Sequence, residues 1–189
     1  MTELLYYQDA YLKEFDAAVV DVDAGENTLR VVLDRTTFYP GGGGQPNDTG
    51  SLMINDARFG VTKVKRDGSK LWHWLATDGG EPSIAIGDPV HGELDWERRY
   101  RLMRTHTAMH VLCGVIWRDY GASVTGGNMD PGKSRMDFEF ESMTRDLISE
   151  IEAACSAEIA IGHDVRARIL PREEAFQIPD LIRTKINLL

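Results

Sequence analysis

Five short runs of alternating apolar and polar residues lie within the first 90 positions, and they constrain the fold more than any other feature of this chain. Each run is bounded by Gly, Asn or Asp, which favour turns. Strands this short and this closely spaced favour a small barrel or a strongly bent sheet. The runs cover residues 17–25, 27–34, 50–55, 59–66 and 70–76.

The pattern changes after Thr77–Leu94, a segment rich in Gly and Pro that we interpret as a domain boundary. From Asp95 to Gly121 the apolar residues follow helical spacing, and these two residues suit the helix ends. The sequence therefore predicts an α+β protein. A small β-barrel-like domain with a glycine-rich loop would occupy residues 1–90, and a domain with a long histidine-bearing helix would occupy residues 91–189.

Within the second domain we expect further elements of both kinds. A second amphipathic helix is predicted over Thr144–Ala160, with Leu147, Ile148 and Ile151 facing inward. Between the two helices, residues 121–133 are expected to form a glycine-rich loop and residues 134–140 a strand. After the second helix we expect a strand at 164–170 and a short helix at 171–177.

Composition excludes several classes of protein. The 189 residues include 21 Lys and Arg against 30 Asp and Glu, a net charge of −9, which argues against a general nucleic-acid coat but allows one local basic patch. Two cysteines, Cys113 and Cys155, make no disulfide framework and are expected to be buried thiols. No apolar run approaches the roughly 20 residues that span a bilayer, and the N-terminus does not resemble a signal peptide. We expect a cytoplasmic protein.

The most specific chemical motif is a pair of histidines, His106 and His110, on the predicted long helix. The i, i+4 spacing places both imidazoles on one helix face, close enough to bind the same metal ion. A zinc metalloprotease of the His-Glu-x-x-His type would need Glu at the position of Thr107, so that class is disfavoured. Two histidines on a polar helix face without a shared task are the alternative, because zinc sites use three or four ligands.

Four consecutive glycines stand between Thr36 and Gln45, in the segment T-T-F-Y-P-G-G-G-G-Q. Glycines allow close backbone approach and positive φ angles, which can leave amide groups free to bind an anion or a polar ligand. Gln45 could add a donor and an acceptor there. The segment lacks the Gly-Lys-Ser/Thr ending of a P-loop. Taken alone, it favours a wide turn between two strands over a ligand site.

Positive charge is concentrated just before the histidine pair, and a second small cluster lies on a predicted strand. The first group is Arg98, Arg99, Arg101 and Arg104, and the second is Lys63, Lys65 and Arg66. In an acidic chain, such groups could mark where the phosphates of a nucleic acid bind. A solvated helix face is the simpler alternative for the arginines.

The other aromatic and histidine residues carry weaker signals. Trp72 and Trp74 flank His73 on a predicted strand and are expected in the core or at an interface. His73 and His91 have no partner in register, and His163, between two regular elements, is a poor candidate for a metal ligand.

Together these motifs resemble the AlaX family of free-standing alanyl-tRNA editing proteins and the related editing domain of alanyl-tRNA synthetase. Four motifs occur in family order over most of the chain: T-x-F-Y-P-x-G-G-G-Q-P-x-D-T-G at Thr36–Gly50, R-T-H-T-A-M-H at Arg104–His110, R-M-D-F at Arg135–Phe138 and I-R-T-K at Ile182–Lys185. Two-domain members of that family have an N-terminal β-barrel-like module and a C-terminal α/β editing domain, in agreement with the boundary near residue 90.

The resemblance implies a trans-editing hydrolase that deacylates Ser-tRNA(Ala), or secondarily Gly-tRNA(Ala). His106 and His110 would bind zinc, whose bound water, with a pKa of about 7, would attack the ester at the tRNA 3′ end. Thr36 and Gln45 match family positions that line the amino-acid pocket. There the Thr36 hydroxyl could bond a serine side chain that alanine lacks. The arginines near His106 would face the acceptor stem or the terminal CCA of the tRNA.

The chain departs from the family pattern at its C-terminus. The family completes its metal site with a Cys, sometimes replaced, and a His four residues later, beyond the I-R-T-K segment. This chain ends at Leu189, and neither Cys113 nor Cys155 has a histidine four residues downstream. The chain is then truncated, or its site is completed by something else, or it is not an active editor. The ending, without cap or turn, favours truncation.

Two other functions compete with editing. In the first, the chain is a non-catalytic tRNA-binding module with a vestigial metal site, which the missing second ligand pair favours. In the second, it is a metal-dependent hydrolase of a small ester or amide that does not bind RNA. Metal content would separate the first from an editor. Salt-sensitive tRNA binding would count against the second, because phosphate contacts weaken steeply with salt.

Overall fold

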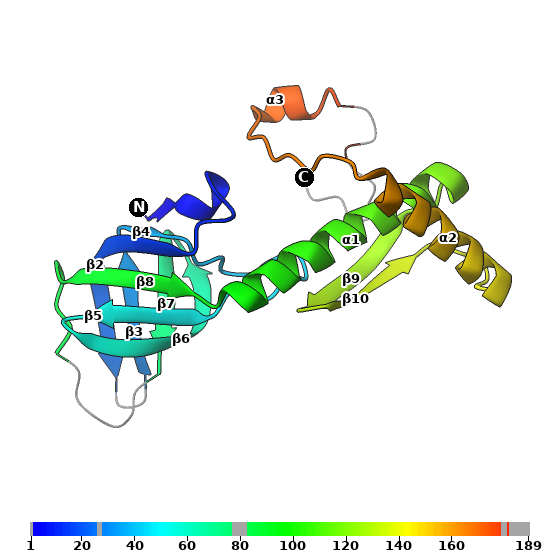
Figure 1. The fold of residues 1–189 in the computed structure, drawn as a ribbon. Coiled ribbons are helices and arrows are strands. Elements are labelled where there is room, and N and C mark those ends of the chain that lie inside the picture. Colours follow the sequence, from blue (N-terminus) through cyan, green and yellow to red (C-terminus); the bar gives the residue numbers. More distant parts are fainter. Residues whose placement is uncertain (1, 26–27, 77–82, 179–180, 182–189) are drawn as a thin grey trace. The chain divides into compact units, whose positions relative to one another are not determined.

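A computed structural model describes residues 2–25, 28–76, 83–178 and 181 (Figure 1). The chain divides into two compact units, Met1–Met103 and Arg104–Leu189, and the division lies inside the long helix α1 (Trp96–Tyr120). Sequence patterning placed the boundary near residue 90, in a segment whose residues 77–82 lie outside the described part. The end of that segment, from Pro89 to Leu94, is a strand of the first unit.

Six antiparallel strands close a barrel in the order β2-β3-β7-β6-β5-β8 (Figure 1). The alternation of apolar and polar residues suits a barrel, because successive side chains of a strand point to opposite faces. In β8, for example, every second residue is buried. The predicted N-terminal barrel is confirmed. Its strands are β2 (Glu14–Gly25), β3 (Thr28–Leu33), β5 (Gly50–Ile54), β6 (Ala57–Asp67), β7 (Lys70–Leu75) and β8 (Pro89–Leu94).

The barrel interior is one continuous apolar cluster, with residues such as Val31, Leu33 and Leu52 fully buried. A close contact between two strands requires glycine at position 92. Phe15 on β2 pairs with Gly92 on β8, and a Cβ at Gly92 would lie 2.2 Å from the Phe15 ring. The aromatic ring therefore fills the space that a side chain at position 92 would take.

A small parallel sheet lies next to the barrel and includes Thr36. The strand β1 (Glu3–Leu4) pairs with β4 (Arg35–Thr36), and the short 3-10 helix η1 (Leu5–Tyr7) follows β1. The Thr2 hydroxyl donates a hydrogen bond of 2.7 Å to the Leu33 carbonyl. These bonds fix the strand that leads into the glycine-rich segment.

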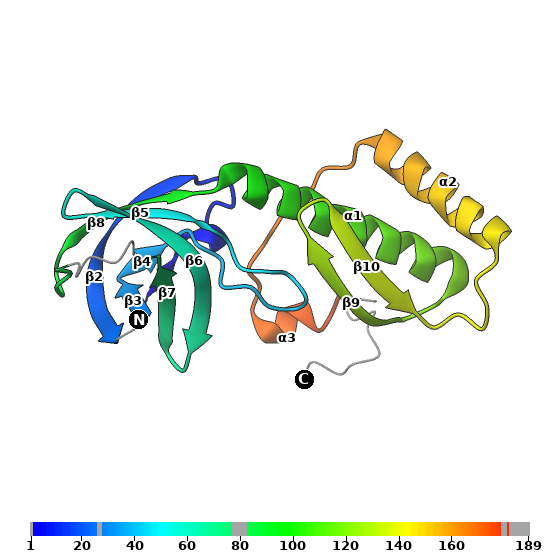
Figure 2. The same cartoon turned by 90° about the horizontal axis from the view of Figure 1, so that it is seen from below.

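In the second unit, a β-hairpin runs beside the later turns of α1 (Figure 2). It consists of β9 (Val124–Asp130) and β10 (Lys133–Phe138). The Gly132 amide at its turn donates to the Thr105 hydroxyl on α1 at 2.9 Å. The helix α2 (Arg145–Ile161) packs with α1 and the hairpin in a second, smaller apolar cluster around Ile116 and Ile151, and α3 (Arg172–Ala175) follows.

The helix ends lie where the sequence predicts them. The Asp95 carboxylate accepts the Arg98 amide at 3.1 Å, and the Thr144 hydroxyl accepts the Leu147 amide at 3.2 Å, so both side chains cap helix starts. Gly121 follows the last residue of α1 with a φ of 63°. Among the described residues, no helix is long and apolar enough to span a bilayer.

Three expectations for the second unit are corrected. Residues 121–133 are not a glycine-rich loop but mostly strand β9. A Cβ at Gly127 would lie only 2.9 Å from the Arg135 carbonyl, so the glycine here allows the two strands to pair closely. Residues 164–170 form no strand, since no neighbouring strand pairs with them among the described residues. Ile148 is 48% exposed, while Ile151, one turn later, is buried.

Candidate active site

The two motif histidines lie together on the part of α1 that belongs to the second unit. His106 and His110 are both exposed, with ring centroids 4.9 Å apart and ring planes at 17°. Helical i, i+4 spacing produces this stacked arrangement. Partial burial, and then the neighbouring His110, lowers the pKa of His106. The neutral imidazole that this favours is the form that binds metal.

The histidine pair fits zinc in kind but not in number. Imidazole nitrogens are common zinc ligands, and a site needs three or four of them or their equivalents. Among the described residues, no group of three or more His, Cys, Asp or Glu side chains gathers in a way that could hold a metal. Cys113 and Cys155 are free thiols. Within the described part of the chain, the histidine pair could supply two of the donors that a zinc site would need.

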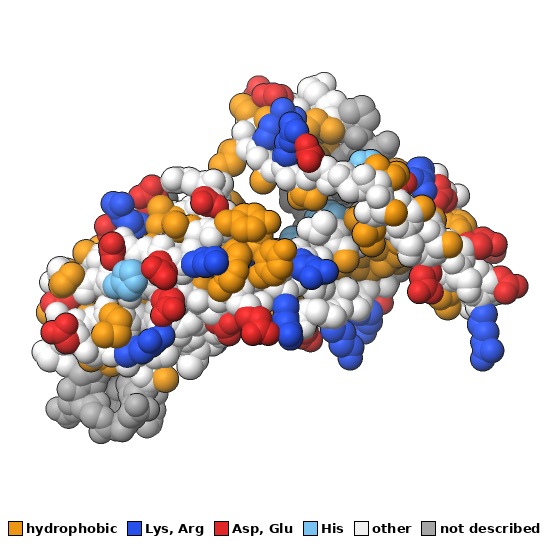
Figure 3. Space-filling view, viewed as in Figure 1, with side chains coloured by type: hydrophobic (Ala, Val, Ile, Leu, Met, Phe, Trp, Pro, Cys, Tyr) orange, Lys and Arg blue, Asp and Glu red, His pale blue; other side chains and the backbone are white. Residues whose placement is uncertain are grey.

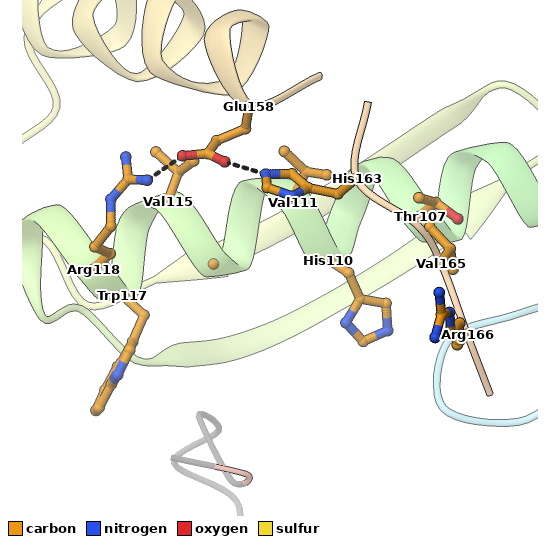
Figure 4. Close-up of a pocket in the computed structure, with 11 residues that line it drawn as sticks. Thr107, His110, Val111, Val115, Trp117, Arg118, Glu158, His163, Val165 and Arg166 are labelled. Carbon is orange, nitrogen blue, oxygen red and sulfur yellow. Dashed lines mark hydrogen bonds and ion pairs between the residues drawn. The ribbon is translucent and has the colours of Figure 1, made fainter. Parts of the chain in front are cut away.

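A pocket of about 920 Å³ opens beside His110 in the second unit (Figure 4). Glu158 accepts a hydrogen bond there from Arg118 and interacts with His163 Nε2 at 3.0 Å. Arg118, and then His163, lowers the pKa of Glu158 below its ordinary value. The His110 ring points away from Glu158 and His163 (Figure 4). His163 is therefore held by a carboxylate, and the His110 ring is turned away from it.

Thr36 lies fully buried in the first unit, next to a histidine that sequence patterning left without a role. Its hydroxyl is 3.0 Å from His73 Nε2, and the opposite ring nitrogen is 3.3 Å from the Val31 carbonyl. A carbonyl only accepts, so Nδ1 of His73 carries the proton and Nε2 accepts from Thr36. The same hydroxyl accepts the Phe38 amide at 3.1 Å. Thr36 thus both donates and accepts within the protein.

The glycine-rich segment forms a compact turn between β4 and β5. All four glycines, Gly41 to Gly44, have positive φ angles of 81°, 139°, 58° and 84°. The amides of Gly42 and Gln45 donate to each other's carbonyls at 2.9 and 3.0 Å, so neither is free for an anion. The side chain of Gln45 is half-buried at the end of this turn. The turn between strands that the sequence favours is what the structure contains.

A buried ion pair joins the end of this segment to the first turns of α1. The Arg99 guanidinium is 2.5 Å from the Asp48 carboxylate and also donates to the carbonyls of Ala10 and Thr37. Asp48 in turn accepts the Tyr39 amide at 2.7 Å. Arg99 is 4% exposed. Its guanidinium is not available to an RNA phosphate in this structure, and its contacts are structural.

The other three arginines of the predicted RNA-binding group are more accessible. Arg98 is half-buried and donates to the Asn47 carbonyl at 3.2 Å. Arg101 is exposed and pairs with Glu97 at 3.0 Å, and Arg104 is exposed. Their contact with RNA stays a prediction.

The predicted residues belong to two different units of the chain. Thr36 and Gln45 belong to the first unit, and His106 and His110 to the second. Sequence reasoning missed His73, although Leu71, His73 and Leu75 alternate along β7 and all three are buried. That alternation was the signal for an inward-facing histidine. The I-R-T-K segment, residues 182–185, lies outside the described residues.

Known proteins resemble this chain over nearly its whole length. A family model described as tRNA synthetases class II (A) matches residues 2–98. The alanyl-tRNA editing protein AlaX-M of Methanosarcina mazei is 42% identical over 179 residues, which are 93% of this chain and 70% of the relative. AlaX-M of Saccharolobus solfataricus is 39% identical over 185 residues, 97% and 75% of the two chains. The alanine–tRNA ligase of Ignicoccus hospitalis is 40% identical over 177 residues, 92% of this chain and 19% of the ligase.

Proposed function

Because the chain belongs to the AlaX family of alanyl-tRNA editing proteins, we propose that it is an aminoacyl-tRNA deacylase that hydrolyses mischarged alanine tRNA. Its relatives carry the name of alanyl-tRNA editing proteins. The preferred substrate in this proposal is Ser-tRNA(Ala), with Gly-tRNA(Ala) second. The partner is tRNA, and the location is the cytoplasm, which suits the two free thiols.

The observation that carries the proposal is the histidine pair. His106 and His110 are exposed on one helix face with their rings 4.9 Å apart, beside an open pocket. Two imidazoles so placed can bind one metal ion, and we propose zinc. When bound, zinc lowers the pKa of water to about 7 and polarises an ester carbonyl, which supplies a nucleophile at neutral pH.

Substrate recognition is assigned to the glycine-rich segment of the first unit. Gln45 offers both a donor and an acceptor for the amino-acid part of the substrate. The Thr36 hydroxyl is already bonded to His73 and to the Phe38 amide. We therefore give Thr36 a positioning role, in which it holds the start of the segment that ends at Gln45.

Deacylation of Ser-tRNA(Ala) tests this function. With zinc supplied, the protein should release serine, and His106→Ala should lower the rate by about 100-fold or more, because a group that holds the catalytic ion is lost. Zinc content should fall in the same variant. A matched control is His91→Ala, which removes an exposed histidine of the barrel that contacts Asp16. It should deacylate at the normal rate.

The same assay separates editing from binding alone. If His106→Ala hydrolyses the ester as fast as the unchanged protein does, the histidine pair is not the site. Binding of tRNA without hydrolysis by the unchanged, zinc-supplied protein would identify a binding module. Hydrolysis of small esters without affinity for tRNA would identify the small-substrate hydrolase.

Gln45→Ala tests the role of the glycine-rich segment. We expect it to lower kcat more than it lowers the affinity for tRNA, because Gln45 is proposed to contact the amino acid and not the RNA backbone. An equal loss in hydrolysis and in tRNA affinity would make the segment a docking element instead.

A further inference from the structure

Three aromatic side chains lie together on the surface of the first unit where α1 begins. Figure 3 shows hydrophobic side chains gathered over this part of the molecule. Trp96 and Tyr100 are one helical turn apart and stack with centroids at 5.8 Å and planes at 27°. Tyr11, from the segment before β2, lies 5.7 Å from Trp96. Tyr11 is 61% exposed and Tyr100 is 41% exposed. Exposed apolar side chains that cluster on a protein surface are typical of binding sites.

Cations accompany these rings. Lys13 is exposed and its Nζ lies 4.9 Å from the centre of the Trp96 ring. Arg101, next to Tyr100, forms an ion pair with Glu97, and both side chains are more than half exposed. Such surface pairs contribute little and open easily. The carboxylate of Asp95 is engaged with the Arg98 amide. In Figure 3 basic side chains lie beside the hydrophobic group at the start of α1.

We propose that Tyr11, Trp96 and Tyr100 form a stacking surface for unpaired nucleotides of tRNA, with Lys13 and Arg101 contacting the adjacent phosphates. The proposal rests on the proposed function for the identity of the RNA. Trp96 contacts both tyrosines and Lys13, so it holds the surface together, and the two exposed tyrosines receive bases. We choose unpaired bases because their ring faces are free to stack on aromatic side chains. In a duplex these faces are covered by the neighbouring bases.

A second aromatic surface, on the outside of the barrel, is less suited to this task. The rings of Trp72 and Trp74 are already covered by the Arg30 guanidinium, at 4.4 and 5.2 Å. Lys70 and Lys63 lie over the same two rings. A base would have to displace these cations before it could stack. The tyrosines at the start of α1 need no such displacement.

Binding of a short single-stranded RNA, compared with the same sequence as a duplex, tests the proposal. Tyr100→Ala should weaken single-strand binding by about 5- to 150-fold, the range for one base stacked on one ring. Tyr100→Phe keeps the ring and should bind normally. Tyr100→Leu keeps apolar area without an aromatic face and should bind as poorly as Tyr100→Ala. Tyr7→Ala removes another exposed tyrosine of the same unit and should change nothing.

The salt dependence of binding tests the cations. Lys13→Gln should lower the slope of log affinity against log salt by about 0.7, the value for one phosphate contact on a single strand. Thermal unfolding of each variant checks that the fold is kept, which is expected at these exposed positions.

Equal binding by Tyr100→Ala and the unchanged protein would overturn the proposal, as would a preference for the duplex. Equal binding by Tyr100→Leu and Tyr100→Phe would replace stacking with a general apolar contact and also overturn it. Deacylation of Ser-tRNA(Ala), measured in parallel with His106→Ala, reports on the editing function separately. Deacylation by the unchanged protein with no effect of Tyr100→Ala on RNA binding would reject the stacking surface and leave the editing function standing.

Discussion

Among single residues, His73 has the most unusual environment of the described histidines. It is fully buried, and burial lowers its pKa to about 4, although its hydrogen bond to Val31 acts in the opposite direction. The neutral ring accepts from Thr36 and donates to Val31. The residue therefore fixes one rotamer of the Thr36 hydroxyl, and through it the start of the glycine-rich segment, only while it is unprotonated.

The first prediction concerns the pH dependence of stability. An unfolded His73 would protonate near its ordinary pKa of about 6.5, but the folded one only near 4. As the pH falls, the unfolded state thus takes up the proton first. The contribution of neutral His73 to the free energy of unfolding is therefore fully present above about pH 6.5. It is lost progressively as the pH falls toward 4, by up to about 3 kcal/mol.

Urea unfolding at pH 7 and at pH 4.5 measures this loss. His73→Gln keeps a donor and an acceptor but does not titrate, so the stability gap between it and the unchanged protein should narrow at the lower pH. Two stability curves that run parallel between pH 7 and 4.5 would show that His73 does not titrate as the structure implies.

At the scale of elements, the first turns of α1 are fastened to the glycine-rich segment by Arg99 and Asp48. Both side chains are almost fully buried. The guanidinium bonds the carboxylate and two backbone carbonyls, and the carboxylate also holds the Tyr39 amide. A buried pair with its remaining donors and acceptors satisfied is costly to break by removing one partner.

The second prediction is that Arg99→Met destabilises the protein by about 3–5 kcal/mol, because the Asp48 carboxylate is left buried without a counter-charge. Removing that charge as well, in Arg99→Met with Asp48→Asn, should recover part of the loss. Urea unfolding of both single variants and the double variant measures the coupling. Losses that simply add would show that the two side chains do not depend on each other.

At the scale of the whole molecule, the two units have apolar clusters of very different extent. The barrel cluster draws buried residues from all six barrel strands. The cluster of the second unit has three buried members among the described residues, Ile116, Ala122 and Ile151, with partly buried residues packed around them. Because apolar burial is the main stabilising contribution, the second unit should open more readily than the barrel.

Hydrogen exchange of backbone amides tests the third prediction. We expect α2 amides to exchange through a lower-energy opening than the amides of β3 and β7. Ile151→Ala should lower the protection of α2 further, by about 2–5 kcal/mol, and leave the barrel unchanged. Ile148→Ala, on the same helix but exposed, is the control and should alter neither unit. Equal loss of protection in the barrel would mean that the chain opens as one unit.

Local pattern alone determined much of this protein. Alternation at period two predicts the barrel strands, and a period of 3.6 places His106 and His110 on one face of α1. Capping chemistry predicts the ends of that helix at Asp95 and Gly121. Each of these features depends on residues within a few positions of one another, so no knowledge of the rest of the chain is needed.

Only the tertiary structure determined which polar side chains form buried hydrogen bonds and ion pairs within the protein. Thr36 meets His73 across 37 positions, and Arg99 meets Asp48 across 51. Local pattern cannot tell a buried arginine from one on a solvated face, because the difference lies in the distant partner. The loop prediction for residues 121–133 was wrong for the same reason. Gly127 by itself indicates a loop, and only its contact with the carbonyl of Arg135 on the neighbouring strand shows why glycine is there. Hydrogen bonds and strand pairs between distant residues form only when the chain folds. These contacts determine the environments of Thr36, Arg99 and Gly127, which local pattern does not predict.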